Sequence, residues 1–99
     1  MGIDVTNSEV TAHRVPATSG DNEWTFRDHH GNNGIDSKSP TFSLANLSTM
    51  IASAKDGQQS QATFDGVCGG IGNGVGTWYN GRSSEFKATI RSVLSHFPG

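Results

Sequence analysis

The chain has 99 residues, of which 13 are glycine and 32% are hydrophobic, and its formal net charge is -2 at pH 7. This length allows one domain with one modest core and excludes two. The near-neutral charge argues against nucleic acid as the main partner, because phosphate binding requires clustered lysine and arginine.

Charge is unevenly distributed along the chain. Residues 1–36 contain six acidic residues and two arginines, a balance of -4, whereas residues 80–99 have three cationic side chains and one glutamate, a balance of +2. Protonation of all four histidines in acidic medium would change the formal charge from -2 to +2. These histidines are His13, His29, His30 and His96.

The first third of the chain predicts a β-hairpin. A strand is expected over about residues 8–15, ended by Pro16. The alternation in residues 23–27 places Trp24 and Phe26 on one face of a second strand. The inner face of this hairpin is therefore aromatic.

Residues 28–40 predict a polar, solvated loop, with glycine and Pro40 as breakers. Asp28, His29, His30 and Asp36 are potential metal ligands, but their spacing matches no recognised site. No metal or other cofactor is therefore expected.

A helix is predicted over residues 42–55. Ser43 is the expected N-cap, and Phe42 and Leu47 have the spacing of a hydrophobic staple. Gly57 follows the end of the helix. Its apolar stripe consists of Leu44, Leu47, Met50, Ile51 and Ala54.

Residues 61–79 predict a second hairpin, connected through Gly69–Gly74. Phe64 and Cys68 share one strand parity, and Val75 and Tyr79 share another. Glycines at 66, 74 and 76 permit another element to approach closely. The glycine spacing also suggests a phosphate cradle, but the lysine and the directly following helix of a P-loop are missing.

Cys68 is the only cysteine, so no intrachain disulfide can form. An apolar environment is the expected setting for such a residue, and we predict a buried thiol.

Residues 83–97 predict a strongly amphipathic helix with Ser83 as N-cap. Lys87 and Arg91 lie on its polar side. A stripe of this kind suits a protein core, and beside cationic side chains it also suits the boundary of an anionic membrane. The apolar stripe consists of Phe86, Ile90, Val93, Leu94 and Phe97.

These elements predict an α+β fold in the order ββαββα over a single domain, residues 1–99. One antiparallel sheet of about four strands would carry two helices on one face, as a two-layer sandwich, because each element has one apolar side.

Residues 66–81, GVCGGIGNGVGTWYNG, and the preceding segment SLANLSTMIASAK resemble the small secreted killer toxins and effector-like proteins of fungi. The length, charge, absence of disulfides and last helix are most similar to the monomeric, virus-encoded killer toxins of yeasts. Unlike most disulfide-rich fungal toxins, this chain has no partner for Cys68.

The resemblance implies the mature chain of a processed, secreted precursor. Such a toxin binds cell-wall mannoprotein of a susceptible yeast and permeabilises its plasma membrane, without catalysis. It is a monomer in solution, and whether it assembles on the membrane is left open. The implied membrane-interacting residues are Phe86, Ile90, Val93, Leu94 and Phe97, with Lys87 and Arg91 as surface-binding charges.

Two other classes of function remain open from the residues. A non-enzymatic binding module, such as an inhibitor or immunity-type protein, would present Trp24, Trp78, or His29 and His30 to a partner. An enzyme, such as a nuclease dependent on these histidines or His13, would need an acid and a base in one cleft. No motif supports this, so we expect a protein that is not an enzyme.

Overall fold

A computed structural model of the chain describes residues 5–6, 10–15, 23–29 and 36–97. Its sheet is antiparallel throughout, in the order β1-β2-β3-β4, with β5 also paired to β3. The strands are β1 (Val5–Thr6), β2 (Val10–Arg14), β3 (Glu23–Asp28), β4 (Ser37–Lys38) and β5 (Phe42–Ser43). The helices are α1 (Leu44–Lys55), α2 (Gln61–Gly69), α3 (Val75–Asn80) and α4 (Ser84–Ser95).

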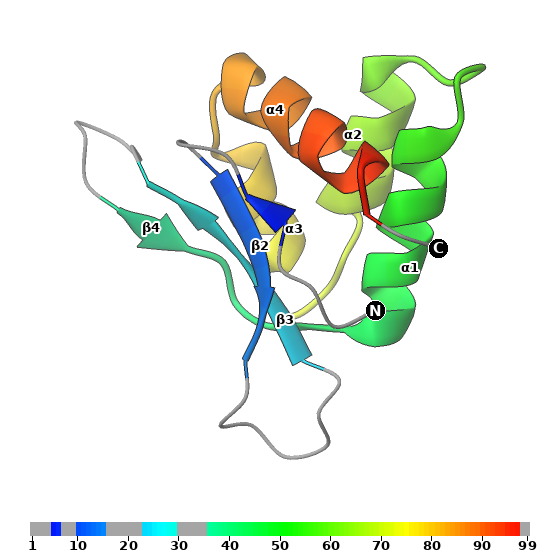
Figure 1. Cartoon of the computed structure of the whole chain (residues 1–99). Helices are drawn as coiled ribbons and strands as arrows, with labels where there is room; N and C mark the ends of the chain where they lie inside the picture. The colour runs from blue at the N-terminus through cyan, green and yellow to red at the C-terminus, as the bar shows by residue number, and fades with distance from the viewer. Residues whose placement is uncertain (1–4, 7–9, 16–22, 30–35, 98–99) are drawn as a thin grey trace.

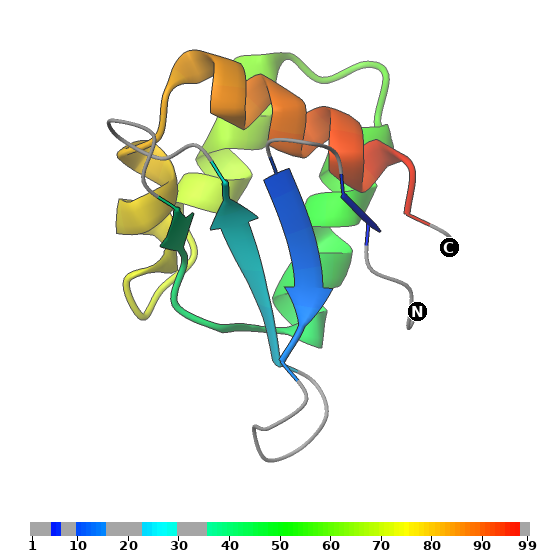
Figure 2. The same ribbon diagram turned by 60° about the vertical axis from the view of Figure 1, so that its left-hand side comes forward.

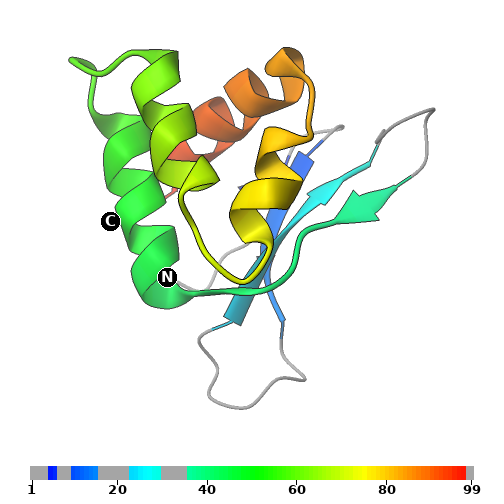
Figure 3. The ribbon, with the colours of Figure 1, turned by 180° about the vertical axis from the view of Figure 1, so that it is seen from behind.

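The helices cover one face of the sheet, as Figures 1 and 2 show. Figure 3, seen from behind, has α1 and α2 side by side at the outside of the helical layer. The α4 helix crosses them and packs on α1, α2 and β2. The predicted α+β fold, with helices packed on one face of an antiparallel sheet, is confirmed.

The aromatic hairpin is formed by β2 and β3, as predicted. Ala12 lies opposite Phe26, and Arg14 lies opposite Trp24. Trp24 and Phe26 are both buried beneath the helices. The apolar alternation was readable because the helices cover one face of this hairpin, whereas Thr25 on the other face, although buried, is polar and hydrogen bonded to Ser39.

The predicted loop over residues 28–40 is partly wrong. Asp28 ends β3, and β4 pairs with it, while β5 pairs with the other end of the same strand. Between β4 and β5, the Ser39 hydroxyl accepts a hydrogen bond from the Phe26 N–H at 3.0 Å. Polar residues here satisfy the backbone of β3, so no apolar alternation marks the segment. His30 lies outside the described residues.

The predicted helices at 42–55 and 83–97 are confirmed as α1 and α4, each slightly shorter than expected. Ser43 and Ser83 are their N-caps, and each hydroxyl accepts a hydrogen bond from the backbone N–H three residues later. Phe42 belongs to β5 and is buried, as is Leu47.

The predicted hairpin over residues 61–79 is wrong, and with it the order ββαββα: this segment forms α2 and α3. Phe64 and Cys68, like Val75 and Tyr79, are four residues apart, a spacing that places two side chains on one side of either a strand or a helix. Ser60 caps α2 by accepting a hydrogen bond from the Thr63 N–H at 3.1 Å.

Two glycines decide how α2 and α3 are joined. Asn73 and Gly74 both have positive φ, 61° and 87°, which turns the chain before α3. A Cβ atom on Gly76 would lie 2.2 Å from the Gly69 carbonyl oxygen, so α3 starts directly against the end of α2. The expected close approach at glycine therefore occurs at Gly76. A Cβ at Gly74 would be in ordinary contact with the Pro40 ring, and nothing lies within 4 Å of a Cβ at Gly66.

Candidate membrane-active helix and groove

The apolar stripe of α4 is part of the core. All five predicted membrane-interacting apolar side chains are buried, with exposed fractions between 0% at Ile90 and 6% at Phe86. The exposed residues of α4 are small or polar: Ser84, Glu85, Ala88 and Ser92. In this state the apolar stripe of α4 is not available to a membrane.

Two tryptophans hold the ends of α4. The Trp78 and Phe86 rings meet edge to face with centroids 5.5 Å apart, and the Trp24 and Phe97 rings do so at 5.9 Å. The residues predicted to bind a partner and those predicted to bind a membrane thus contact one another. Only 2% of the Trp24 surface is exposed, so another protein could not reach this side chain while α4 is docked.

Trp78 is half-buried and fixed by polar contacts. Its indole N–H donates to the Ser37 hydroxyl at 2.8 Å. The Arg82 guanidinium lies 4.7 Å from the Trp78 ring centre and forms a 3.8 Å ion pair with the Asp28 carboxylate. These contacts join β3, β4 and α3 next to the start of α4.

Lys87 and Arg91 face α2 and α3. The Lys87 ammonium lies 5.8 Å from the Tyr79 ring centre, and the Arg91 guanidinium 5.9 Å from that of Phe64. Arg91 also donates to the Gln59 carbonyl at 2.7 Å, in the connection between α1 and α2. The predicted surface-binding charges therefore take part in docking α4.

A polar cluster lies under α4, between α2 and α3. The Asp65 carboxylate accepts hydrogen bonds of 2.8 Å from the Tyr79 hydroxyl and the Gln61 amide. Burial, followed by the negative charge of Asp65, raises the pKa of the Cys68 thiol to about 12. Burial also raises the pKa of Tyr79, so both groups are neutral at physiological pH. The predicted buried thiol is confirmed.

Alkylation of Cys68 is expected to report opening of this cluster. At about pH 8 a pKa of about 12 leaves roughly one thiolate in ten thousand, and burial excludes the reagent. Iodoacetamide should label the native protein at least about a thousandfold more slowly than the denatured chain, measured by mass spectrometry. Equal rates would contradict a closed α2–α3 pair. Denatured protein in the same buffer is the control.

The two described histidines of the first third of the chain, His13 and His29, are hydrogen bonded to different groups. The His29 Nε2 atom is hydrogen bonded to the Thr11 hydroxyl at 2.7 Å, and His13 Nδ1 lies 3.2 Å from the Arg14 carbonyl. In the described part of the chain, no three histidine, cysteine, aspartate or glutamate side chains are placed to hold a metal ion.

A groove that was not predicted from the sequence opens between β4 and β5, where residues 40–41 do not pair with β3. It has a volume of about 370 Å³ and lies between the Pro40–Ser43 segment, the first turn of α1 and the α2–α3 connection. Glu23, Thr41, Asn46 and Asn73 contribute polar side chains to it, and Pro40 and Ile71 apolar ones. The signal in the sequence was Asn73-Gly74, a pair suited to left-handed backbone.

These features define an α+β protein with a sheet covered on one face, a docked amphipathic helix and a small polar groove. In comparisons with known proteins, no family model, no curated protein and no solved structure matches this chain. The docked helix and the groove are therefore the features of the molecule that bear on its function.

Proposed function

We propose that this protein is a secreted antifungal toxin of the yeast killer-toxin type. It binds cell-wall mannoprotein of a susceptible yeast and then permeabilises the plasma membrane through α4, without catalysis. Nucleic acid plays no part. The resemblance of the sequence supports this proposal, and so does the amphipathic character of α4.

The observation that carries the proposal is the way α4 is held. Its apolar stripe is docked at its ends by the rings of Trp78 and Trp24, and its cations lie against two further aromatic rings. Release of α4 would expose the apolar stripe together with Lys87 and Arg91. This combination binds the interface of an anionic membrane.

For α4 to act on a membrane, its apolar side chains must exchange their contacts with the protein core for contacts with lipid. The five buried side chains each contribute roughly 1.5–3 kcal/mol, so undocking costs about 10 kcal/mol in water. Insertion of the same side chains into lipid contributes a comparable amount. Membrane binding and undocking must therefore be coupled, on one molecule or between several.

The length of α4 determines how it would sit in a bilayer. Its 12 residues span about 18 Å, less than the roughly 30 Å of a hydrocarbon core. Across the described segments, no helix has the length and apolar character needed to cross a membrane. We therefore propose that α4 lies in the interface and permeabilises by disturbing lipid packing.

Dye release from vesicles, paired with killing of a sensitive yeast, tests this function. We expect release from vesicles with anionic lipid, because the cations of α4 are attracted to an anionic surface. Neutralising a cation of α4 by Lys87→Gln should lower release about twofold, because a basic residue near an anionic surface is worth about 1 kcal/mol, whereas the Lys87–Tyr79 contact that helps to dock α4 is worth about 0.5 kcal/mol.

Lys55→Gln is the matched control, because it removes the same charge from an exposed position on α1. It should leave dye release nearly unchanged. Killing without any release from vesicles of the target lipid composition would refute the membrane step. Equal loss in both variants would assign the effect to overall charge instead of α4.

A second candidate function, a non-enzymatic binding module, is favoured by the groove. It predicts a ligand bound by the folded protein with α4 docked, and no dye release at any pH. The two functions are distinguished by the same vesicle experiment.

A further inference from the structure

We infer that the groove between β5, α1 and the α2–α3 connection is a binding site for a neutral saccharide. This adds a recognition site to the cell-wall step of the proposed function, on which it rests for its biological role. The binding itself needs neither a membrane nor release of α4.

The groove exists because strand pairing is interrupted. Residues 37–43 pair with β3 at both ends, but Pro40 and Thr41 between them are unpaired. Proline has no N–H to donate, so pairing is weakest there. On the other side, a Cβ atom on Gly74 would lie 3.4 Å from the Pro40 ring, so the α2–α3 connection approaches closely.

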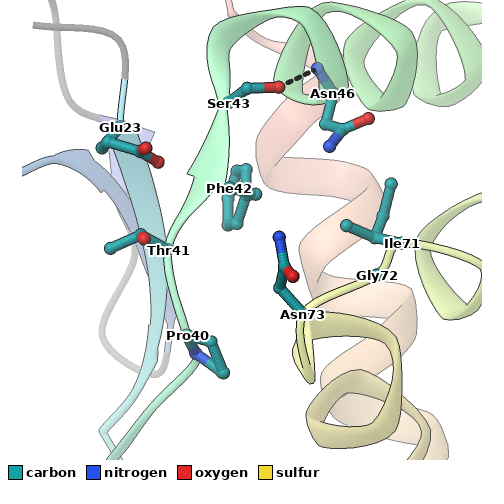
Figure 4. Close-up of a pocket in the computed structure, with 9 residues that line it drawn as sticks. All are labelled: Glu23, Pro40, Thr41, Phe42, Ser43, Asn46, Ile71, Gly72 and Asn73. Carbon is teal, nitrogen blue, oxygen red and sulfur yellow. Dashed lines mark hydrogen bonds between the residues drawn. The ribbon is translucent and has the colours of Figure 1, made fainter. Parts of the chain in front are cut away.

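Polar groups with unused hydrogen-bonding capacity surround this space. Within the described ranges, the side chains of Glu23, Thr41, Asn46 and Asn73 form no hydrogen bond or ion pair. Figure 4 shows the carboxamides of Asn46 and Asn73 turned into the space between α1 and the α2–α3 connection. They come from separate elements, so the fold brings them together.

The backbone at Asn73 supports a role beyond that of a turn. Asn73 is the only described residue other than glycine with positive φ, at 61°. Asparagine tolerates this region better than most residues but still less well than glycine. The chain carries a side chain here, where glycine would relieve the strain, and that side chain faces the groove.

The chemistry of the lining selects the ligand class. No lysine, arginine or histidine lines the groove, which disfavours an anion, and Glu23 is its single charged residue. The two carboxamides and the Thr41 hydroxyl can donate to and accept from vicinal hydroxyl groups, and the Glu23 carboxylate can accept from them. The aliphatic surfaces of Pro40 and Ile71 suit the C–H face of a sugar ring.

The size of the groove agrees with a small ligand. Its volume of about 370 Å³ is at the lower end of the roughly 300–1,000 Å³ found for ligand pockets. A single saccharide unit should bind with a dissociation constant of about millimolar, because its few atoms limit the affinity. A polymeric glycan presents many such units, so one polymer offers many positions at which the groove can bind.

NMR titration of the isotope-labelled protein tests the site. The probes are the methyl glycosides of mannose, glucose and galactose, a cell-wall mannan, and methylammonium as a small cation. We expect at least one glycoside to shift the amide signals of the groove segments, residues 40–46 and 71–73, in a saturable manner. No shift with any saccharide, or saturable binding of methylammonium alone, would overturn the inference.

The double variant Asn46→Ala and Asn73→Gly removes both carboxamides. Alanine suits the first turn of α1 and glycine suits positive φ, so the variant should fold. Binding should weaken about tenfold or more, because two hydrogen bonds to the ligand are lost. Ser48→Ala, an exposed position two residues along α1, is the matched control and should bind as the wild type does.

Unchanged affinity in a folded double variant would also overturn the inference, since the shifts would then come from another surface. Saccharide binding by a protein that releases no dye would refute the proposed membrane step and leave the groove assignment intact. Dye release by a protein that binds no saccharide would refute the groove assignment and leave the membrane step intact. The two proposals therefore fail separately.

Discussion

Trp24→Leu is expected to lower the stability of the protein and, at the same time, to increase dye release from anionic vesicles. Trp24 is buried and packs against Phe97, so a smaller side chain loosens the end of α4 without changing α4 itself. The loss should be about 2–4 kcal/mol. If one or two kcal/mol of this loss lowers the free energy needed to undock α4, dye release should increase about 5- to 30-fold.

The substitution is made in the docking residue because the stripe itself is core. Aspartate at Ile90 or Val93 would place a charge in the interior and unfold the chain, which would say nothing about membranes. Chemical denaturation gives the stability of the Trp24 variant, and fluorescence of an encapsulated dye gives its activity.

Phe42→Leu is the matched control for Trp24→Leu. Phe42 is buried to the same extent, but its ring packs on Phe26 of β3, 4.7 Å between centroids. It should lower stability with little effect on dye release. Equal increases in both variants would attribute release to general loosening and would remove α4 undocking from the mechanism.

Gly76→Ala is expected to be among the most destabilising single substitutions in this chain. The new methyl group would lie 2.2 Å from the Gly69 carbonyl oxygen and 2.7 Å from that of Ile71. Both are backbone atoms, so the clash is relieved only by separating α3 from α2. We expect a loss of about 3 kcal/mol in the free energy of unfolding, measured by denaturant titration.

Gly66→Ala tests the same arrangement of α2 and α3, but this substitution is expected to increase the stability of the protein. Gly66 lies within α2, is exposed, and has open space at the position of a Cβ atom. Alanine should stabilise the protein by about 0.5–1 kcal/mol, because glycine is a poor helix former. Destabilisation by Gly66→Ala, or neutral behaviour of Gly76→Ala, would contradict the α2–α3 arrangement.

The parts of the candidate site that were predictable are those with a local signal. The amphipathic pattern of α4 depends on residues three and four apart, and its N-cap on a serine at one position, so both could be read directly. The groove had no such signal, because its lining comes from three separate segments and only Asn73-Gly74 marks one of them.

Contacts between segments that are distant in the chain could not be predicted from the spacing of residues in the sequence. That Trp24 and Trp78 pack against Phe97 and Phe86 follows from the crossing of α4 over the helical layer, which no spacing encodes. For the same reason Arg91 was read as a surface charge, although it donates to the Gln59 carbonyl, 32 residues away in the chain.

The sequence by itself determined the aromatic β2–β3 hairpin, α1 and α4 with their caps, the buried thiol of Cys68 and the α+β class. Each follows from propensity or periodicity within a short window. Only the tertiary structure decided residues 61–79, because pairs of apolar residues four apart suit a strand and a helix equally. In the folded chain Gly76 lies directly against the end of α2, a contact between two elements that no pattern within a short window records.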